Sequence, residues 1–428
     1  MTVLKKSLLA ATALGVGFGF QGVAFADGYS DGDLKRQLEE LQKRIEELES
    51  QQAENTEALN TDVLRSTGTP GGYRIPGTNT TFRVGGYVKA DFIYDFGEDV
   101  GESLGSPGIG DIDEDAFSFH ARQTRLNIRS STPTRFGNLT TLIETDFFGA
   151  GGNESVSNSF GMRLRHAWAT LGGFGVGQFW SNFDSVEYFA NTIDFAGPSG
   201  YSFGRHPQIR YTTNVSDALQ LRFSIENPES ILDGNTERAN QGGINDPLDF
   251  TPEGIATAVY TGDGFGVRGS ALVGTLSTQG SGDTDTDITF GFQVAGGVNL
   301  TEDLQLIGNA YYGDGISRRF VATGLGVSGG TVTGNNDVDS ASEFGFFVGG
   351  SYQVTEAVSL NAYYGRAEAL DNPGDVLADT RQTAHANIQW SPVARVNTGV
   401  EVSYVDIENA AGAEDDNVRL QAAVQVTF

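Results

Sequence analysis

The sequence predicts an all-β transmembrane barrel of 16 antiparallel strands. The final segment, residues 418–428, alternates apolar and polar side chains and ends on Phe428. A two-residue period places one set of side chains on each face of a strand. In a soluble sheet, an apolar strand at the end of the chain would risk edge-to-edge pairing. A barrel that pairs its first strand with its last, with lipid outside and water inside, uses this pattern directly.

The same alternation recurs from residue 82 onwards, and the connections between the segments differ in length. Short connections such as 172–173 alternate with long ones such as 97–116 and 182–206. Short turns on one side and long loops on the other are typical of outer-membrane barrels. A soluble β-sandwich is the alternative, but it would not need so many aromatic outward stripes. The predicted strands are 82–96, 117–130, 137–148, 159–171, 174–181, 207–214, 217–226, 254–262, 265–276, 287–299, 303–313, 343–353, 357–367, 379–391, 395–407 and 416–428.

Three segments precede the barrel, which is predicted to occupy residues 81–428. Residues 1–26 contain two lysines, then an apolar run, and end in small residues, as secretory signal peptides do. A membrane-spanning helix is the alternative, but the run is short and rich in glycine. Residues 61–80 are rich in glycine, proline and threonine and are predicted to form a linker.

Residues 27–60 are predicted to form an α-helical coiled coil that drives oligomerisation. Their apolar residues are spaced by four and three positions, the heptad pattern of helices that associate along one seam. A lone amphipathic helix is the alternative, but it could bury little of its apolar stripe. Because an even number of strands returns the chain to its starting side, this helix is expected in the periplasm. The seam residues are Leu34, Leu38, Leu41, Ile45 and Leu48.

The composition excludes some partners and constrains the fold. The chain has a formal net charge of -28, and the predicted signal peptide removes two lysines and no acid. Such acidity argues against nucleic-acid partners. Cysteine is absent, so the fold depends on strand pairing and packing without disulfides.

Arginine is concentrated on the inward face of the early strands. After residue 60 the chain has a single lysine and is otherwise cationic through arginine, whereas inward positions of the later strands are mostly Gln, Asn and Ser. The planar guanidinium binds a carboxylate or phosphate through two hydrogen bonds, and rows of such groups favour anions in a pore. The side chains predicted to line the pore and bind anions are Arg83, Lys89, Arg125, Arg129, Arg163, Arg165, Arg210 and Arg222.

A structural role for these arginines is the alternative. Glu144 and Asp146 lie on the inward face of the strand between the arginine strands. They could pair with Arg125 or Arg129 on one side and with Arg163 or Arg165 on the other. Cross-strand pairs of this kind contribute only about 0.2–1 kcal/mol each. The surplus of arginine over nearby acid favours an anion path.

The long connection 182–206, the third along the barrel, is predicted to fold into the lumen and narrow it. Its aromatic residues would be costly to expose to water, and contact with a partner on the outer rim is the alternative. Its acids Asp184, Glu187 and Asp194 are expected to set a transverse field opposite the arginines. The aromatic residues of this connection and its flanks are Trp180, Phe183, Tyr188, Phe189, Phe195, Tyr201 and Phe203.

Residues 73–226 resemble the DcaP-like porins of Gram-negative outer membranes. The resemblance implies a homotrimer of sixteen-stranded barrels with an inward-folded third loop, embedded among outer-membrane lipid and lipopolysaccharide. It also implies uptake of small anionic organic acids such as dicarboxylates or aromatic carboxylates. The N-terminal heptads match that family's layout, whereas the later strands resemble porins only in pattern. The segments that carry the resemblance are Tyr73–Gly77, Phe82–Phe92, Arg122–Arg125, Glu144–Phe148, Arg163–Ala167, Gly177–Phe183 and Arg205–Tyr211.

The sequence therefore predicts an outer-membrane porin for passive diffusion of small hydrophilic solutes, with a preference for anions. A phosphate-selective or general diffusion porin and a structural tether are the alternatives. An enzyme is not predicted, because none of His120, His166, His206 and His385 stands in a recognisable nucleophile motif. By alternation, His166 aligns with the outward face. No cofactor and no metal site are expected.

Overall fold

The computed structural model describes residues 31–62, 65–66, 71–97, 99–105, 114–228, 230–232, 249–279, 284–320, 324–326, 328–333 and 337–428. The predicted signal peptide, residues 1–26, lies outside the described residues, as do residues 27–30. The chain divides into two compact units, residues 1–63 and residues 64–428. Among the described residues, no helix is long and apolar enough to cross a membrane.

The first unit contains the predicted helix. Helix α1 extends from Asp31 to Asp62 and carries the apolar residues of the heptad pattern. In the single chain, the side chains of Leu38, Leu41, Ile45 and Leu48 are between 54% and 61% exposed. The apolar stripe is therefore uncovered in the monomer.

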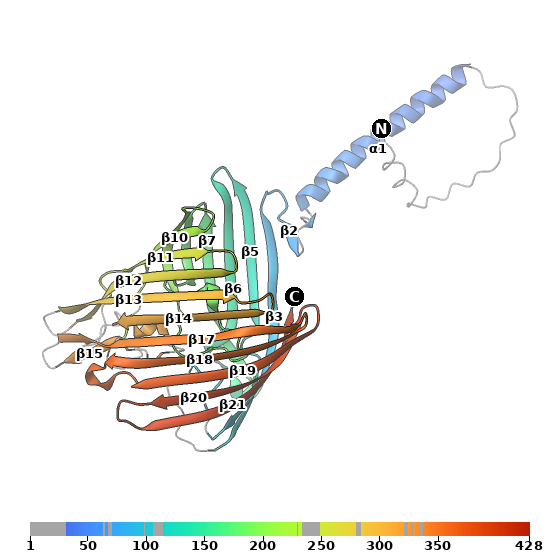
Figure 1. Ribbon diagram of the computed structural model, residues 1–428. Helices are drawn as coiled ribbons and strands as arrows, with labels where there is room; N and C mark the ends of the chain where they lie inside the picture. The colour runs from blue at the N-terminus through green and yellow to red at the C-terminus, as the bar shows by residue number, and fades with distance from the viewer. Residues whose placement is uncertain are drawn as a thin grey trace. The chain divides into compact units, whose positions relative to one another are not determined.

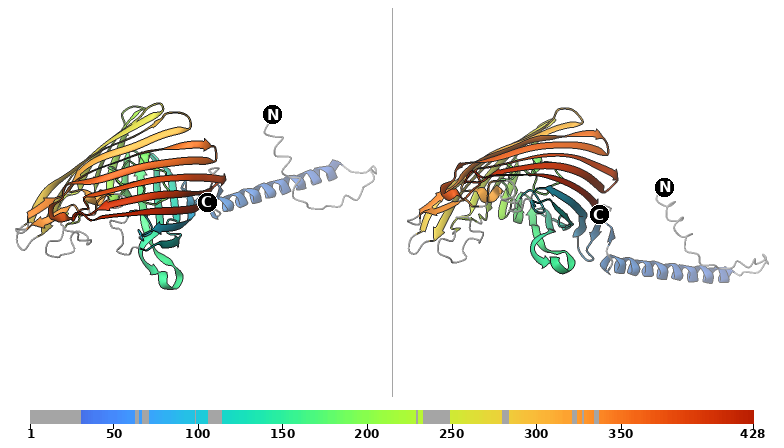
Figure 2. Two further views of the ribbon diagram at one scale, coloured as in Figure 1. Left: turned by 60° about the horizontal axis from the view of Figure 1, so that its bottom comes forward. Right: turned by 90° about the horizontal axis from the view of Figure 1, so that it is seen from below.

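The second unit is a closed barrel of 16 antiparallel strands (Figures 1 and 2). Strands β4 and β5 both pair with β3 and together form one spanning segment. Each segment predicted from the alternation contains one spanning strand. These strands are β3 (Thr81–Phe96), β4 (Ala116–His120) with β5 (Arg125–Thr134), β6 (Gly137–Asn153), β7 (Ser159–Leu171), β8 (Phe174–Trp180), β9 (Arg205–Asn214), β10 (Leu219–Glu226), β11 (Glu253–Thr261), β12 (Phe265–Gln279), β13 (Thr284–Asn299), β14 (Leu304–Asp314), β17 (Ser342–Thr355), β18 (Val358–Asp371), β19 (Thr380–Val393), β20 (Val396–Glu408) and β21 (Glu414–Thr427).

The last strand closes the barrel, as its sequence pattern predicts. β21 pairs with β3, with Val418 opposite Phe96 and Thr427 opposite Tyr87. Along β21 the apolar side chains are exposed on the outer face, while Arg419 and Gln421 are buried on the inner face. The closed ladder leaves no free edge among these strands.

Short elements complete the barrel unit. Residues 61–80, predicted to be a linker, contain two short strands, because β1 pairs with β2 and β2 pairs with β3. The ring of Tyr73 on β2 lies 5.8 Å from that of Phe82 and holds this extension against the barrel. The short elements are β1 (Arg65–Ser66), β2 (Gly72–Arg74), α2 (Glu154–Ser157), η1 (Val186–Tyr188), η2 (Ser317–Phe320), β15 (Gly330–Thr333), β16 (Asp337–Ser340) and η3 (Pro373–Asp375).

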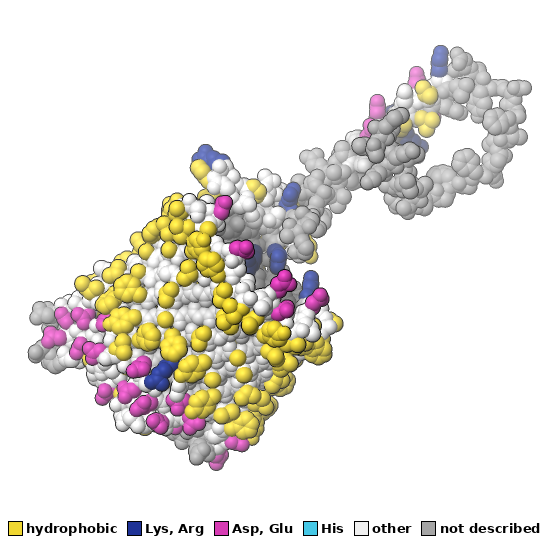
Figure 3. All heavy atoms as spheres, in the orientation of Figure 1, with side chains coloured by type: hydrophobic (Ala, Val, Ile, Leu, Met, Phe, Trp, Pro, Cys, Tyr) yellow, Lys and Arg dark blue, Asp and Glu magenta, His cyan; other side chains and the backbone are white. Residues whose placement is uncertain are grey.

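The outer wall is apolar, and the packed core lies inside the barrel. Figure 3 shows apolar side chains spread over the outer wall and acidic side chains gathered toward the loop end, where β15 is labelled in Figure 1. An apolar band of this extent suits a hydrocarbon surrounding rather than water. Inside, Phe183 and Tyr201 of the connection between β8 and β9 are buried against the inner wall. This connection, residues 181–204, is called the third loop below.

Candidate functional site

The lumen has two unlike sides. Strands β3–β9 form the arginine wall, and strands β10–β21 form the loop-bearing wall, on which the third loop packs. Asn309 on β14 donates to the carbonyl of Gly200 (3.2 Å), and Gln293 on β13 donates to Ser202 (2.8 Å). The inward Asn and Gln side chains, predicted to be the neutral half of an open pore, therefore bind the third loop instead.

Glycines on the loop-bearing wall make room for the third loop. A Cβ atom at Gly365 would lie 2.0 Å from the carbonyl oxygen of Ser199, and one at Gly266 would lie 2.4 Å from the hydroxyl of Tyr188. Distances this short are not tolerated between non-bonded atoms. The absence of a side chain at these positions thus allows the loop backbone and Tyr188 to approach the wall.

A cavity of roughly 170 Å³ lies between the third loop and the arginine wall. Its aromatic side is a contact network in which Phe189 meets the rings of Trp180 and Tyr201 edge-on, both at 5.2 Å between centroids. Such contacts restrict ring movement. The lining residues are Gln123, Arg125, Arg165, Trp180, Phe189, Ala190, Thr192, Asp194, Phe195, Ala196, Gly197, Tyr201 and Phe203.

Two carboxylates on β6 hold the arginines of β7. Arg163 binds Asp146 with Nε and Nη2 at 3.0 and 2.7 Å. Arg165, which is buried, donates to Glu144 at 2.9 Å and to Asp146 at 2.8 Å. The pairs that the sequence allowed as the structural alternative are therefore present.

The arginines outnumber these carboxylates at the cavity. Arg125 approaches Glu144 only at 3.8 Å. The guanidinium of Arg205 lies 3.8 Å above the ring of Trp180, and its buried Nε and Nη2 atoms have no hydrogen-bond partner among the residues that the structure describes. Its positive charge is repelled by those of Arg125, Arg163 and Arg165. Four guanidinium groups thus face two carboxylates, which leaves a positive potential next to the cavity.

A β-bulge on β7 directs two adjacent side chains into the lumen. The register between β6 and β7 shifts between Glu144 and Thr145, so that His166 rather than Arg165 pairs with Glu144. A bulge inserts one extra residue and changes the face of every residue beyond it. The prediction that His166 faces outward is therefore wrong. The imidazole is buried, and its ring lies 4.6 Å from that of Phe179.

Three of the predicted pore-lining side chains are used in fixing the third loop or its flank. Lys89 is only 6% exposed, and its Nζ lies 3.0 Å from both Asp91 and the carbonyl of Ile193. Arg222 pairs with Glu187 of the third loop at 2.6 Å. Arg210 donates to Gln208 at 2.9 Å and to the carbonyl of Trp180. These cations are bound to fixed partners, although the side chain of Arg222 remains 18% exposed.

Arg83 and Arg129 lie apart from the cavity. They are exposed and directly opposite each other in the ladder between β3 and β5. Their strands reach the short-turn end of the barrel at this point, whereas the cavity lies beside the third loop. These two arginines therefore contribute charge at the short-turn end of the arginine wall.

The three acids of the third loop are fixed rather than free. Asp184 is fully buried and accepts from the backbone N–H of Gly204 at 3.0 Å, and burial raises its pKa to about 7. Asp194 is buried too and pairs with Arg419 at 3.3 Å. Asp184 is closed off from the lumen, whereas Asp194 lines the cavity but is paired with Arg419. The transverse field expected from these two acids stays a prediction.

Glu187 bridges the third loop to the loop-bearing wall. Its carboxylate pairs with Arg222 and with Arg268, each at 2.6 Å. Burial opposes ionisation of this carboxyl, but the attraction of Arg268 and Arg222 outweighs burial and lowers its pKa. Glu187 is therefore charged and neutralised in place.

A Ser-His-Glu cluster on β19 and β20 was not visible from sequence spacing. Nδ1 of His385 lies 3.2 Å from Glu401 and 3.1 Å from the hydroxyl of Ser403. A hydrolytic triad needs the acid and the nucleophile on opposite ring nitrogens. Here both address Nδ1, all three side chains are buried, and Glu401 accepts from the backbone of Asp194. The cluster anchors the third loop.

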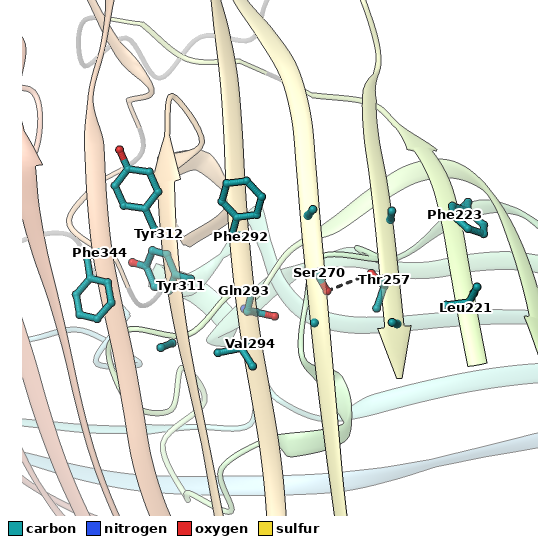
Figure 4. Close-up of a pocket in the computed structure, with 15 residues that line it drawn as sticks. Leu221, Phe223, Thr257, Ser270, Phe292, Gln293, Val294, Tyr311, Tyr312 and Phe344 are labelled. Carbon is teal, nitrogen blue, oxygen red and sulfur yellow. Dashed lines mark hydrogen bonds between the residues drawn. The ribbon is translucent and has the colours of Figure 1, made fainter. Parts of the chain in front are cut away.

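Larger hollows lie on the outer wall. Figure 4 shows one of about 580 Å³, to which Phe223, Phe292 and Phe344 contribute exposed aromatic rings. Thr257 and Ser270, joined by a 3.1 Å hydrogen bond, are buried toward the inside of the barrel. The hollow is lined by apolar, lipid-facing side chains and offers no charged group. The cavity beside the arginine wall is therefore the candidate site.

Comparison with known proteins agrees with this architecture. A family model described as "Porin subfamily" matches residues 66–425. No curated protein sequence matches the chain. The outer membrane channel DcaP of Acinetobacter baumannii is 22% identical, with a TM-score of 0.72 over 82% of this chain and 98% of that chain.

More distant porin structures share the fold. An anion-selective porin from Comamonas acidovorans is 12% identical, with a TM-score of 0.55 over 82% of this chain and all (100%) of that chain. OmpT of Vibrio cholerae, solved in a trimer form, is 12% identical, with a TM-score of 0.53 over 82% of this chain and 99% of that chain.

Proposed function

The chain belongs to the porin subfamily, and on that premise we propose that it prefers small anionic organic acids among the solutes that diffuse through it. Proteins of this family are outer-membrane diffusion channels and not enzymes. The preferred solutes would be dicarboxylates or aromatic carboxylates. They would cross passively through the water-filled space between the third loop and the arginine wall.

The excess of guanidinium over carboxylate at the cavity carries this proposal. Glu144 and Asp146 are both paired with Arg163 and Arg165. The positive charge that is left over comes from Arg125 and Arg205. Guanidinium donors replace part of an anion's hydration shell, and a charged constriction selects by sign. The rings of Trp180, Phe189 and Phe203 line the cavity and supply apolar surface against which an aromatic acid can pack.

The test is the reversal potential of the channel in a planar bilayer under a KCl gradient. We expect a wild-type preference for chloride, and a several-fold lower anion-to-cation permeability ratio in the double variant Arg125→Gln, Arg205→Gln. Arg366→Gln is the matched control, because this arginine is on the outer wall and pairs with Glu368 at 3.4 Å. Cation preference of the wild type would overturn the proposal.

Block of the chloride current by other anions, together with conductance itself, separates the alternatives. Succinate or benzoate should reduce chloride current more than phosphate does if organic acids are preferred. Stronger block by phosphate would favour a phosphate-selective porin, and equal weak block would favour general diffusion. A folded barrel without conductance would favour a structural tether.

We propose in addition that the protein is a homotrimer whose α1 helices associate as a coiled coil in the periplasm. The uncovered stripe of Leu38, Leu41, Ile45 and Leu48 supports this, because such a stripe is buried most simply against copies of itself. Outer-membrane lipid and lipopolysaccharide would surround the barrels. Leu41→Glu with Ile45→Glu should lower the mass of the complex measured by light scattering in detergent. An unchanged mass would refute the role of the helix.

A further inference from the structure

We propose that Arg319 of the sixth loop is a positioning residue that locks the third loop in place and thereby sets the geometry of the cavity. The sixth loop is the connection between β14 and β17, residues 315–341, in its described parts. The inference rests on the proposed function only in that conductance is one of its two measurements.

The sixth loop enters the barrel beside the base of the third loop. Ile316, which precedes η2, and Phe320, the last residue of η2, are buried in one cluster with Phe183 of the third loop. The ring of Phe320 stacks on that of Tyr311 at 3.6 Å. A Cβ atom at Gly313 would lie 2.5 Å from Ile316, so this insertion also depends on a glycine. The sixth loop is therefore part of the interior packing.

Arg319 joins this insertion to both ends of the third loop. Its Nη1 donates to the hydroxyl of Ser181, the first residue of the third loop, at 2.6 Å. Its carbonyl accepts from the backbone N–H of Phe203, close to the last residue, at 3.2 Å. The side chain is 1% exposed, so these bonds form away from water.

The same guanidinium neutralises two buried acids. Nη1 lies 2.9 Å from Glu226, and Nη2 pairs with Glu253. These glutamates are direct cross-strand partners on β10 and β11. Glu226 also accepts from the backbone N–H of Asn182 at 2.7 Å. One carboxylate thus bridges Arg319 and the third-loop backbone, and we call Arg319, Ser181, Glu226 and Glu253 the Arg319 lock.

Loss of Arg319 would leave two like charges adjacent, buried and unpaired. Such a site must take up protons or admit water, and a broken buried pair is strongly unfavourable. The base of the third loop would then loosen at Ser181 and Phe203. Because Trp180 and Phe203 line the cavity on either side of this base, loosening would change the width of the constriction while the charged groups of the arginine wall stay the same in number.

Single-channel recording of the full-length protein tests the lock. We expect Arg319→Met to increase the variance of the open-channel current several-fold, while the reversal potential stays at its wild-type value. The current variance of Arg319→Lys should lie between those of wild type and Arg319→Met. An ammonium group neutralises the two acids but cannot form the paired hydrogen bonds of a planar guanidinium. Arg366→Met on the outer wall is the control and should behave as wild type. A wild-type trace from Arg319→Met would overturn the lock.

A second measurement is independent of conductance. The natural chain has no cysteine, so Ser202→Cys places a single thiol in the third loop at a fully buried position. We expect a small thiol reagent to label it several-fold faster when Arg319→Met is added. Equal labelling refutes the lock even if the channel does not conduct. If Arg319→Met fails to fold, Arg319→Lys is the deciding variant. A current variance and a labelling rate equal to those of wild type in Arg319→Lys would also refute the Arg319 lock.

Discussion

The two sides of the lumen differ in how many of their arginines are closed off from the lumen. On the loop-bearing side, Arg268, Arg319, Arg381 and Arg419 are at most 2% exposed. Each binds a loop or a carboxylate that a loop provides or shares. On the arginine wall, Arg165 is equally buried between Glu144 and Asp146, but the side chains of Arg125 and Arg163 remain 22% and 36% exposed, and Arg125 lines the cavity. The partner that folding brings to a guanidinium, and not the residue type, decides whether it stabilises the barrel or faces solute.

The comparison also separates stability from selectivity. A buried guanidinium with its acid partners is expensive to break, because removal of one partner strands the other charge in a medium of low dielectric constant. A partly exposed guanidinium is screened by water and contributes little to stability. We therefore expect variants of the loop-bearing wall to change folding and variants of the arginine wall to change permeation.

The largest effect is expected for Arg419→Met. Arg419 binds Asp95 through Nε and Nη2 at 2.7 and 2.8 Å and also pairs with Asp194. Its loss should lower the free energy of unfolding by about 3–5 kcal/mol, as removal of one partner of a buried pair does. Urea unfolding in detergent, followed by tryptophan fluorescence, measures this, with Arg129→Met as the control. Equal unfolding free energies of the two variants would show that arginines on the two walls contribute equally to stability.

A smaller loss is expected for Gly365→Ala on β18. The new Cβ would collide with the carbonyl of Ser199 and push the third loop from its seat. Overpacking of this kind costs about 1–3 kcal/mol. Gly269→Ala on β12 is the matched control, because a Cβ there would meet no atom of the described residues within 4 Å. Thermal unfolding followed by circular dichroism compares the two. If Gly365→Ala and Gly269→Ala have the same melting temperature, the close approach at Gly365 does not constrain the third loop.

Part of the pH dependence of the unfolding free energy should come from Asp184 of the third loop. Burial raises its pKa from the usual 3.8 to about 7, so over this range the folded protein holds a proton that the unfolded chain releases. The unfolding free energy should therefore fall as pH rises from about 4 to about 7. Asp184→Asn should remove that part of the decline. Melting temperatures at pH 5 and pH 8 test this, and an unchanged pH difference in the variant would contradict it.

The smallest effect is expected for Arg83→Gln at the short-turn end. Arg83 is exposed and faces Arg129 across the ladder, so its removal relieves a like-charge contact. Stability should stay within about 0.5 kcal/mol of wild type. Anion preference should fall slightly at low salt and return to wild type in concentrated salt. A large shift in reversal potential at high salt would place a selective site outside the cavity.

Part of the candidate site could be predicted from the sequence. Alternation assigned Arg125, Arg163 and Arg165 to the lumen, because side-chain direction in a strand is set by position alone. Arg205 was missed as a site residue, since it stands where the third loop re-enters the sheet and its contact with Trp180 has no signature in spacing. Alternation also misassigned His166, because a bulge shifts the period by one and leaves composition unchanged.

By itself the sequence determined the sixteen strands, their inward and outward faces, the closure of β21 on β3 and the helix α1, because these follow from local periodicity and from the surrounding solvent. Only the tertiary structure decided what the inward polar residues do. Whether Asn309 faces water or Gly200, and whether Lys89 faces a solute or Ile193, depends on where the long loops pack. Contacts between segments far apart in the chain set those positions, and no local pattern encodes them.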